Sequence, residues 1–314
     1  MDNLIFSLNA TVPVFFMMLL GIFFRKIGWM DQDFASKLNR FVFQIALPVV
    51  LFQDLAGEDF SQVWNFSFVA FCFCATLISI VAIALIARLV VKKEILGEFV
   101  QASYRSSAAL LGIAFIQNIY GDAGMAPLMI IGTVPLYNIM AVLILSIMNP
   151  TRQQMYRNAL KKAGIGILTN PILWGIAIGL LWSLCRLPQP EIMKKTVDSV
   201  GALATPLGLM AMGAGFEGRK ALAMVKPTLA ASFLKLIVLV GVFLPIAISM
   251  GFRKEALVAI LIMLGSATTV SSYVMAKNMG HDGVLTSSVI MVTTCLSAFT
   301  ITGWLFLLRT LNLI

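Results

Sequence analysis

The chain has 314 residues, of which 60% are hydrophobic and only 12% are charged. Soluble globular domains carry about 25% charged residues, so this composition excludes an ordinary soluble protein. The net charge of +9 does not indicate a nucleic-acid partner, because the basic residues lie in short loops between apolar runs and no large soluble domain is left to hold such a site.

Apolar runs of roughly 20 residues recur along the chain, and each is long enough to cross about 30 Å of hydrocarbon. Period-two alternation is absent, so the runs are predicted to be helices. The first run begins after the acidic Asp2 without a basic segment, and no cleavable signal is expected. The sequence predicts ten transmembrane helices, at residues 4–24, 39–55, 63–90, 104–119, 125–148, 164–184, 196–216, 227–250, 256–278 and 284–308.

Lysines and arginines are divided unequally between the two sets of loops that these helices define. One set carries sixteen, including Arg105 at the start of the fourth predicted helix, and the other carries six. The richer set is expected to face the cytoplasm. The sequence therefore predicts a multi-pass protein of the plasma membrane with both termini outside the cell.

The residues that most often bind metals give no metal or cofactor signature. The four cysteines show no metal spacing and lie in or beside apolar runs, so we interpret them as small apolar residues. The single histidine, His281, lies in a predicted loop. We therefore expect no cofactor and no metal site.

The two halves of the chain resemble each other when one is shifted by 158 residues. Pro13 and Pro48 of the first half are 35 residues apart, and Pro171 and Pro206 of the second half have the same separation without a gap. A shift of 159 residues aligns the later part, for example Ser107 with Ser266 and Gly121 with Gly280. The shift of 158 aligns Pro13 with Pro171, Gly21 with Gly179, Lys37 with Lys195, Ala46 with Ala204, Pro48 with Pro206, Leu51 with Leu209 and Gly57 with Gly215.

This similarity predicts two repeats of five helices, at residues 1–150 and 151–314. Five is an odd number, so the second repeat enters the membrane from the opposite side. Inverted repeats are typical of secondary transporters, which bind substrate near the midplane where corresponding helices are broken.

Small and hydroxyl-bearing residues occupy corresponding places in the fourth and ninth predicted helices, at 106–112 and 265–272. Glycine weakens a helix, and serine and threonine can bond freed backbone groups. Irregular backbone at this depth is tolerated only inside protein or beside a water-filled cavity. The alternative is tight helix packing through small residues.

The candidate substrate-binding residues follow from this pattern. Facing N-termini of broken helices would form an anion site from backbone N–H groups. Polar residues elsewhere could line the facing wall or could form interhelical hydrogen bonds instead. The candidates are Ser106, Ser107, Gly112, Gln117 and Asn118 in the fourth helix, Gly265, Ser266, Thr268, Thr269, Ser271 and Ser272 in the ninth, and Gln44, Asn138 and Thr205 on the facing wall.

Lys235 is predicted to lie near the bilayer centre, because it follows Lys226 at the cytoplasmic boundary by nine residues, or roughly 13 Å of helix. A lysine at that depth usually faces a cavity or a partner. It could pair with an anionic substrate, remain as a charge inside the moving part of the protein, or extend to the membrane surface. No carboxylate is expected at a similar depth, since Asp54, Asp122, Asp198 and Asp282 fall at helix ends.

The sequence resembles the auxin efflux carrier family, whose bacterial members include malate and malonate permeases. The resemblance covers nearly the full length. It is carried, in this order, by LNRFVFQIALPVVLF (38–52), YRSSAALLGIAFIQNIYGDAG (104–124), LTNPILWGIAIGLL (168–181), PLGLMAMGAGF (206–216), FLKLIVLVGVFLP (233–245) and GSATTVSSYVMAKNMG (265–280).

The resemblance implies an all-α fold of ten helices, similar to the sodium/bile-acid symporters, in which the fourth and ninth helices are broken and cross. It implies a scaffold from helices 1, 2, 6 and 7, a transport bundle from helices 3, 4, 5, 8, 9 and 10, a homodimer and an elevator-like cycle. Related sequences often carry asparagine at Ser107 and proline at Ala114 or Ala267. Here the breaks are expected to depend on Gly112, Gly265 and the hydroxyl groups.

We therefore expect a transporter of small organic anions, either carboxylates such as malate and malonate or auxin-like aromatic acids. A channel is the first alternative and an intramembrane enzyme the second; the enzyme would need paired acids or a nucleophile with a histidine. The missing deep carboxylate gives no basis for proton coupling. A sodium ion bound by hydroxyls and carbonyls, and uniport without a coupled ion, both stay open. The expected partners are the substrate, membrane lipid and a second copy of the chain, without nucleic acid.

Overall fold

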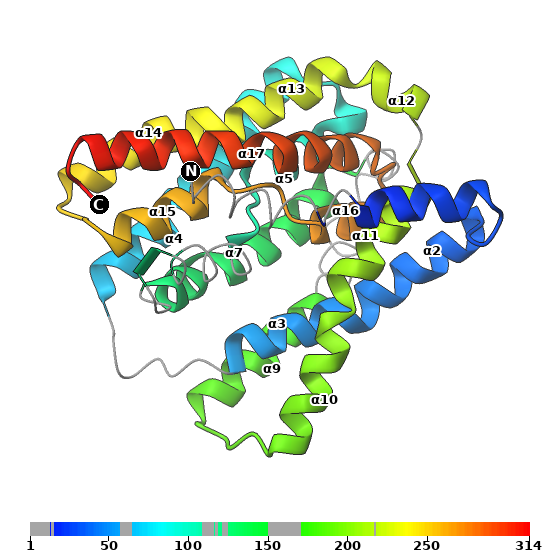
Figure 1. Ribbon diagram of the computed structural model, residues 1–314, viewed down its shortest axis with the longest axis horizontal. Helices are drawn as coiled ribbons and strands as arrows, with labels where there is room; N and C mark the ends of the chain where they lie inside the picture. Colours follow the sequence, from blue (N-terminus) through cyan, green and yellow to red (C-terminus); the bar gives the residue numbers. More distant parts are fainter. Residues whose placement is uncertain are drawn as a thin grey trace.

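The structure, a computed structural model, describes residues 13, 16–56, 65–108, 116, 119–120, 125–149, 171–216 and 218–314. Across these residues the regular secondary structure is helical, and no strand is formed (Figure 1). A helix at residues 16–26 precedes the labelled helices. These are α2 (Gln32–Phe41), α3 (Leu47–Ala56), α4 (Phe66–Val90), α5 (Leu96–Tyr104), α7 (Ala126–Ile147), α9 (Pro171–Leu184), α10 (Glu191–Ala202), α11 (Ala204–Ala214), α12 (Gly218–Ala223), α13 (Val225–Phe233), α14 (Leu239–Ser249), α15 (Glu255–Gly265), α16 (Ser271–Asn278) and α17 (Val284–Thr310).

The prediction of an all-helical membrane protein is confirmed. Six helical stretches of the described chain are long and apolar enough to cross a bilayer, and the shorter α9 and α15 are also apolar. Two of the long stretches contain a π-helical segment, at Val42–Ala46 between α2 and α3 and at Leu234–Val238 between α13 and α14. The six are Gln32–Gln53, Phe66–Val90, Leu128–Ile147, Glu191–Ala214, Val225–Ser249 and Val284–Thr310.

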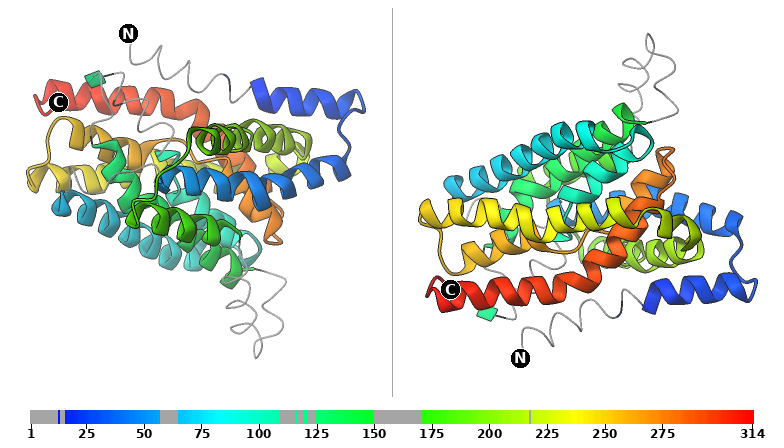
Figure 2. Two further views of the ribbon diagram at one scale, coloured as in Figure 1. Left: turned by 90° about the horizontal axis from the view of Figure 1, so that it is seen from below. Right: turned by 90° about the horizontal axis from the view of Figure 1, so that it is seen from above.

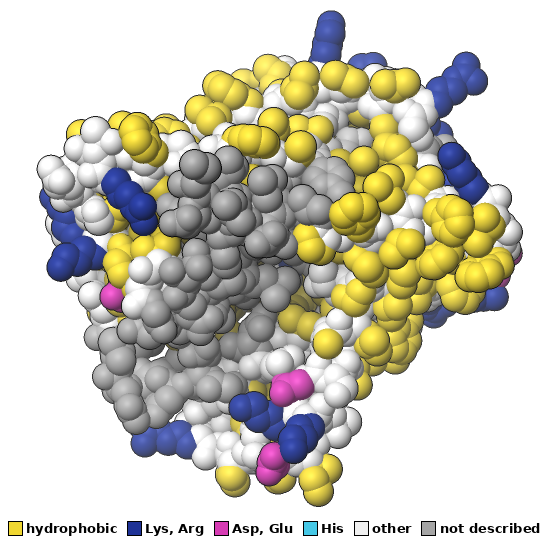
Figure 3. Space-filling view, in the orientation of Figure 1, with side chains coloured by type: hydrophobic (Ala, Val, Ile, Leu, Met, Phe, Trp, Pro, Cys, Tyr) yellow, Lys and Arg dark blue, Asp and Glu magenta, His cyan; other side chains and the backbone are white. Residues whose placement is uncertain are grey.

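Large apolar side chains cover much of the outer surface. Figure 3 shows them spread over one face, with lysines and arginines toward its edges. Leu89 is 86% exposed and Phe306 is 71% exposed, although both lie in long helices. Monomeric soluble proteins rarely expose contiguous apolar areas of this extent. These side chains are therefore placed to face lipid.

Several predicted helix boundaries were wrong. The fourth helix was expected to begin at residue 104, but α5 already begins at Leu96. The polar residues Glu98 and Gln101 lie in this earlier part of α5, and both are buried. The second helix begins at Gln32 rather than residue 39, and the seventh begins at Glu191 rather than residue 196.

One set of helices, formed by α2, α3, α9, α10, α11 and the helix at residues 16–26, packs closely at glycine residues. The contact of α3 with α9 is the most extensive between any two described helices, and the two lie side by side in Figures 1 and 2. A Cβ at Gly175 of α9 would lie 2.4 Å from the carbonyl oxygen of Pro48. Likewise, a Cβ at Gly21 would lie 2.2 Å from the carbonyl oxygen of Met210 in α11. Any larger residue at either glycine would push the helices apart.

A second set consists of α4, α5, α7 and α13 to α17. Within it α4 packs on α7 and α5, α13 packs on α17, and α14 packs on α15. The two sets meet where α16 contacts α2 and α11 and where α7 contacts α9. The candidate site lies at this junction.

Candidate functional site

Two helix breaks meet in the interior. Helix α5 ends at Tyr104 and α15 ends at Gly265, and the extended residues after each end run antiparallel. Ser106 pairs with Thr268 in an isolated bridge, and the N–H of Ser107 donates to the carbonyl oxygen of Ala267 over 3.0 Å. The predicted breaks therefore form at these positions and contact each other directly.

Two hydroxyl groups at the breaks donate hydrogen bonds to backbone carbonyls. The Ser106 hydroxyl donates to the carbonyl oxygen of Met263, near the end of α15. The Thr268 hydroxyl donates in turn to the carbonyl oxygen of Ala102, near the end of α5, over 2.8 Å. The last carbonyls of a helix lack intrahelical partners. Each break thus supplies a donor to the end of the opposite helix.

Lys235 lies at the same junction and is fully buried. Its ammonium donates to the carbonyl oxygens of Tyr104 and Leu264 over 3.0 and 2.9 Å, and to the Ser106 hydroxyl. The lysine therefore contacts the C-terminal ends of both α5 and α15. It does not line the cavity described next.

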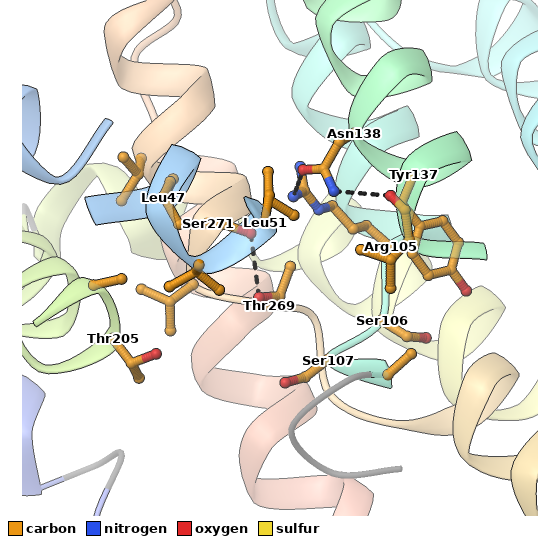
Figure 4. A pocket seen from close by; sticks show the side chains of 16 residues that line it. Leu47, Leu51, Arg105, Ser106, Ser107, Tyr137, Asn138, Thr205, Thr269 and Ser271 are labelled. Atoms are coloured by element: carbon orange, nitrogen blue, oxygen red, sulfur yellow. Dashed lines mark hydrogen bonds between the residues drawn. The ribbon is translucent and has the colours of Figure 1, made fainter. Parts of the chain in front are cut away.

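A cavity of about 100 Å³ lies beside the breaks (Figure 4). One wall comes from α3 and α11, and the other from α7, the two breaks and α16. The cavity is thus bounded by both sets of helices. It is lined by Leu47, Val50, Leu51, Arg105, Ser106, Ser107, Ala108, Val134, Tyr137, Asn138, Ala204, Thr205, Thr269, Val270, Ser271 and Val274.

Arg105 is the charged residue in this lining. It is only 3% exposed, and its guanidinium donates to the amide oxygen of Asn138 and toward the sulfur of Met275. In the described part of the chain the ion pairs are Lys37 with Asp33 and Lys195 with Glu191, both on the surface. Arg105 therefore brings a buried positive charge to the cavity, and no carboxylate of the described residues lines the cavity with it.

The N-terminal end of α16 adds further positive potential. Helix α16 begins at Ser271, and the preceding Val270 provides no side-chain cap. The N–H groups of Ser272 and Tyr273 donate to the carbonyl oxygens of Thr269 and Val270 over 3.0 Å, so this end of the helix contributes chiefly its partial positive charge. The hydroxyls of Thr269 and Ser271 lie 3.3 Å apart beside it (Figure 4). Such an arrangement can bind an anion.

Six of the fifteen predicted site residues line the cavity. Gln44 is exposed on the π-helical segment and lies outside the cavity, whereas Leu47 and Leu51 of the adjoining α3 line it. Gly112, Gln117 and Asn118 fall outside the described residues. The predicted residues that line the cavity are Ser106, Ser107, Asn138, Thr205, Thr269 and Ser271; those buried near it without lining it are Lys235, Gly265, Ser266, Thr268 and Ser272.

Two further cavity residues were not among the predicted site residues. Arg105 was expected at the cytoplasmic start of the fourth helix, where it could attract anions but was interpreted as a topology charge; it is instead buried directly after the end of α5. Tyr137, which the sequence analysis did not single out, lines the cavity and donates to the carbonyl oxygen of Met263 over 3.0 Å. If the fourth helix had been predicted to start well before residue 104, the sequence would have placed Arg105 away from the membrane surface.

A buried carboxylate was also missed. Glu98 of α5 is 1% exposed, although no deep carboxylate was expected. It accepts hydrogen bonds from the N–H groups of Gly283 and Thr286 over 2.9 and 3.0 Å, and from the Thr286 hydroxyl over 2.8 Å. Glu98 therefore caps the N-terminal end of α17, six residues before the end of α5 and away from the cavity.

Among the described residues, no three His, Cys, Asp or Glu side chains gather in a way that could hold a metal ion. The chain matches the family described as membrane transport protein, which is the auxin efflux carrier family, over residues 6–305. It is also 22% identical over 302 residues to an uncharacterized transporter of Methanothermobacter thermautotrophicus, with 95% of this chain and 97% of that protein covered. The match to the family model confirms the resemblance seen in the sequence.

Proposed function

Since the chain belongs to the auxin efflux carrier family of membrane transport proteins, we propose that it carries small organic anions across the plasma membrane by alternating access. The observation that carries this proposal is Arg105. A buried charge is costly unless it is paired. Arg105 lines a cavity without a carboxylate partner in the described chain, so an anionic ligand would complete its pairing.

The ligand class follows from the groups around the cavity. A guanidinium binds a carboxylate through two parallel hydrogen bonds. The uncapped N-terminal end of α16 and the hydroxyls of Thr269 and Ser271 would receive a second acidic or hydroxyl group. The cavity of about 100 Å³ has room for roughly three water molecules at about 30 Å³ each, which is the size of a small acid. This size favours a short dicarboxylate such as malonate or malate over an aromatic acid.

The proposed architecture is ten helices in two inverted repeats of five. Contacts related by the shift of 158 residues support it. Gly21 packs on Met210, and the corresponding Gly179 packs on Phe52. The two surface ion pairs, Asp33 with Lys37 and Glu191 with Lys195, also occupy corresponding positions.

The proposed cycle is an elevator-like movement. The cavity lies between two sets of helices, and substrate bound there contacts both. Helices α2, α3 and α9 to α11 would form the static scaffold, with the helix at 16–26. Helices α4, α5, α7 and α13 to α17 would move with Arg105 and the breaks as the transport bundle. The family resemblance adds a homodimer joined through the scaffold to this proposal.

Counterflow in liposomes tests the proposal. Purified protein would be reconstituted into liposomes that are loaded with unlabelled malonate. Labelled malonate, malate, succinate, benzoate or indole acetate would be added outside, and its uptake into the liposomes would be measured. We expect saturable uptake of a short dicarboxylate that internal substrate accelerates. A channel would show uptake without acceleration by internal substrate, and no uptake of any acid of the panel would contradict the assignment to small organic anions.

A further inference from the structure

The environment of the Lys235 ammonium has the composition of a cation site. Its three acceptors are the carbonyl oxygens of Tyr104 and Leu264 and the hydroxyl of Ser106. An ammonium has three N–H donors and no acceptor, so these contacts satisfy it completely. The Ser106 hydroxyl donates to Met263, which leaves its lone pairs free to accept from Lys235.

The two carbonyls come from helix ends of the same polarity. Tyr104 is the last residue of α5, and Leu264 is the penultimate residue of α15. The C-terminal end of a helix carries partial negative charge, and two such ends meet here. In secondary transporters, half-helix C-terminal ends and unwound carbonyls are the groups that coordinate a sodium ion.

We propose that Lys235 is a tethered cation that occupies a monovalent cation site between the two broken helices. The positive charge holds the ends of α5 and α15 together, and the lysine stem reaches the site from the π-helical segment Leu234–Val238. The consequence for transport rests on the proposed function: a permanently filled site removes the need for a coupled sodium ion at the crossing.

Removal of the side chain would therefore create a site for a free cation. Lys235→Ala deletes the ammonium and leaves room for its replacement. Its thermal unfolding would be measured in choline chloride, in sodium chloride and in n-propylammonium chloride at equal ionic strength, without any substrate. Lys226→Ala, an exposed lysine of the same helical stretch, is the matched control.

We expect Lys235→Ala to unfold below the wild-type temperature in choline, and sodium or propylammonium to raise its midpoint by about 3 °C or more in a saturable manner. The wild type and Lys226→Ala should not respond. If only propylammonium restores the unfolding midpoint, the cation binds together with the space left by the lysine side chain. If sodium restores it, a bare ion fills the site. Both results support a cation site.

Several outcomes would overturn the proposal. One is a Lys235→Ala protein that is as stable as the wild type in choline. Another is a destabilised protein that neither cation restores, including one that stays unfolded when purified in propylammonium. Lys235→Met, which keeps the length of the side chain without charge, provides a second test, because wild-type stability in this variant would show that the charge is not needed.

Transport separates this proposal from the proposed function. Wild-type dicarboxylate uptake should be equal in sodium and choline, and uptake by Lys235→Ala should be lost in choline and partly restored in sodium. If no anion is carried at all, the proposed function fails while the thermal measurements still decide the cation site. Wild-type uptake that requires sodium would contradict the tethered cation.

Discussion

The backbone N–H of Ser107 donates to the carbonyl oxygen of Ala267 over 3.0 Å, which joins two helix breaks from opposite halves of the chain. The two extended segments are in direct backbone contact here, and the residues that carry the contact are small. The serines, threonines and alanines near it are thus explained by close approach as well as by hydrogen bonding. Substitutions that add bulk should therefore be more damaging than those that only delete a hydroxyl.

Leucine at the cavity edge should abolish substrate binding. Ser107 and Ser271 both line the cavity, one on each break. We expect Ser107→Leu and Ser271→Leu to fill this space and to remove the thermal shift that a short dicarboxylate gives the wild type. The measurement is the unfolding midpoint of each purified variant with and without ligand.

Ser199→Leu on the exposed face of α10 serves as the control, and it should keep the full ligand-induced shift. If Ser107→Leu and Ser271→Leu fold and bind as the wild type does, the small residues serve helix packing and the cavity is not the substrate site.

The breaks could be predicted from the sequence because glycine and hydroxyl residues recur at corresponding places in the two halves. The structure confirms a break after Gly265 even though the chain has alanine at 267, where related sequences often have proline. The direction of the hydroxyl bonds could not be predicted. Ser106 and Thr268 each serve the opposite helix, and such a contact depends on how the two helices cross.

The charge pattern gave a less complete account of the site. Arg105 was counted with the cytoplasmic set because the fourth helix was expected to begin at residue 104, whereas Glu98 and Gln101 already belong to α5. Both are buried by contacts with other helices, which no local pattern contains.

Lys235 was predicted to lie deep by counting residues from Lys226, and its side chain is fully buried. Two of its three partners, however, are the backbone carbonyls of Tyr104 and Leu264. Every residue has such a carbonyl, so the sequence does not indicate which ones the lysine contacts.

Glu98 should stabilise the start of α17. Its carboxylate accepts three hydrogen bonds there and lies near the positive end of the helix. Glu98→Gln removes the charge and turns one acceptor into a donor that faces N–H groups. We expect a loss of about 1–3 kcal/mol in the free energy of unfolding, measured by denaturant or heat in detergent. Glu94→Gln, at an exposed glutamate nearby, should cost far less. Equal effects of the two substitutions would show that the cap adds nothing.

The inverted repeat predicts opposite membrane sides for corresponding positions. Ser36 and Lys194 are related by the shift of 158 residues, and both are exposed beside the paired Lys37 and Lys195. In a cysteine-free background, Lys194→Cys should react with an impermeant maleimide in intact cells. Ser36→Cys should react only after permeabilisation, because it lies in α2 beside Lys37, one of the basic residues of the set expected to face the cytoplasm. Labelling of both positions from outside would refute the inverted arrangement.

The central claim is that Arg105 binds the carboxylate of the substrate, and the affinity of purified Arg105→Gln for the best dicarboxylate of the counterflow panel tests it most directly. Titration calorimetry would compare this variant with the wild type and with Arg88→Gln, an exposed arginine on α4. A charged hydrogen bond contributes about 1.5–3 kcal/mol, so we expect Arg105→Gln to weaken binding by at least about tenfold and Arg88→Gln to leave it unchanged. A folded Arg105→Gln protein that binds the dicarboxylate with wild-type affinity would contradict the account.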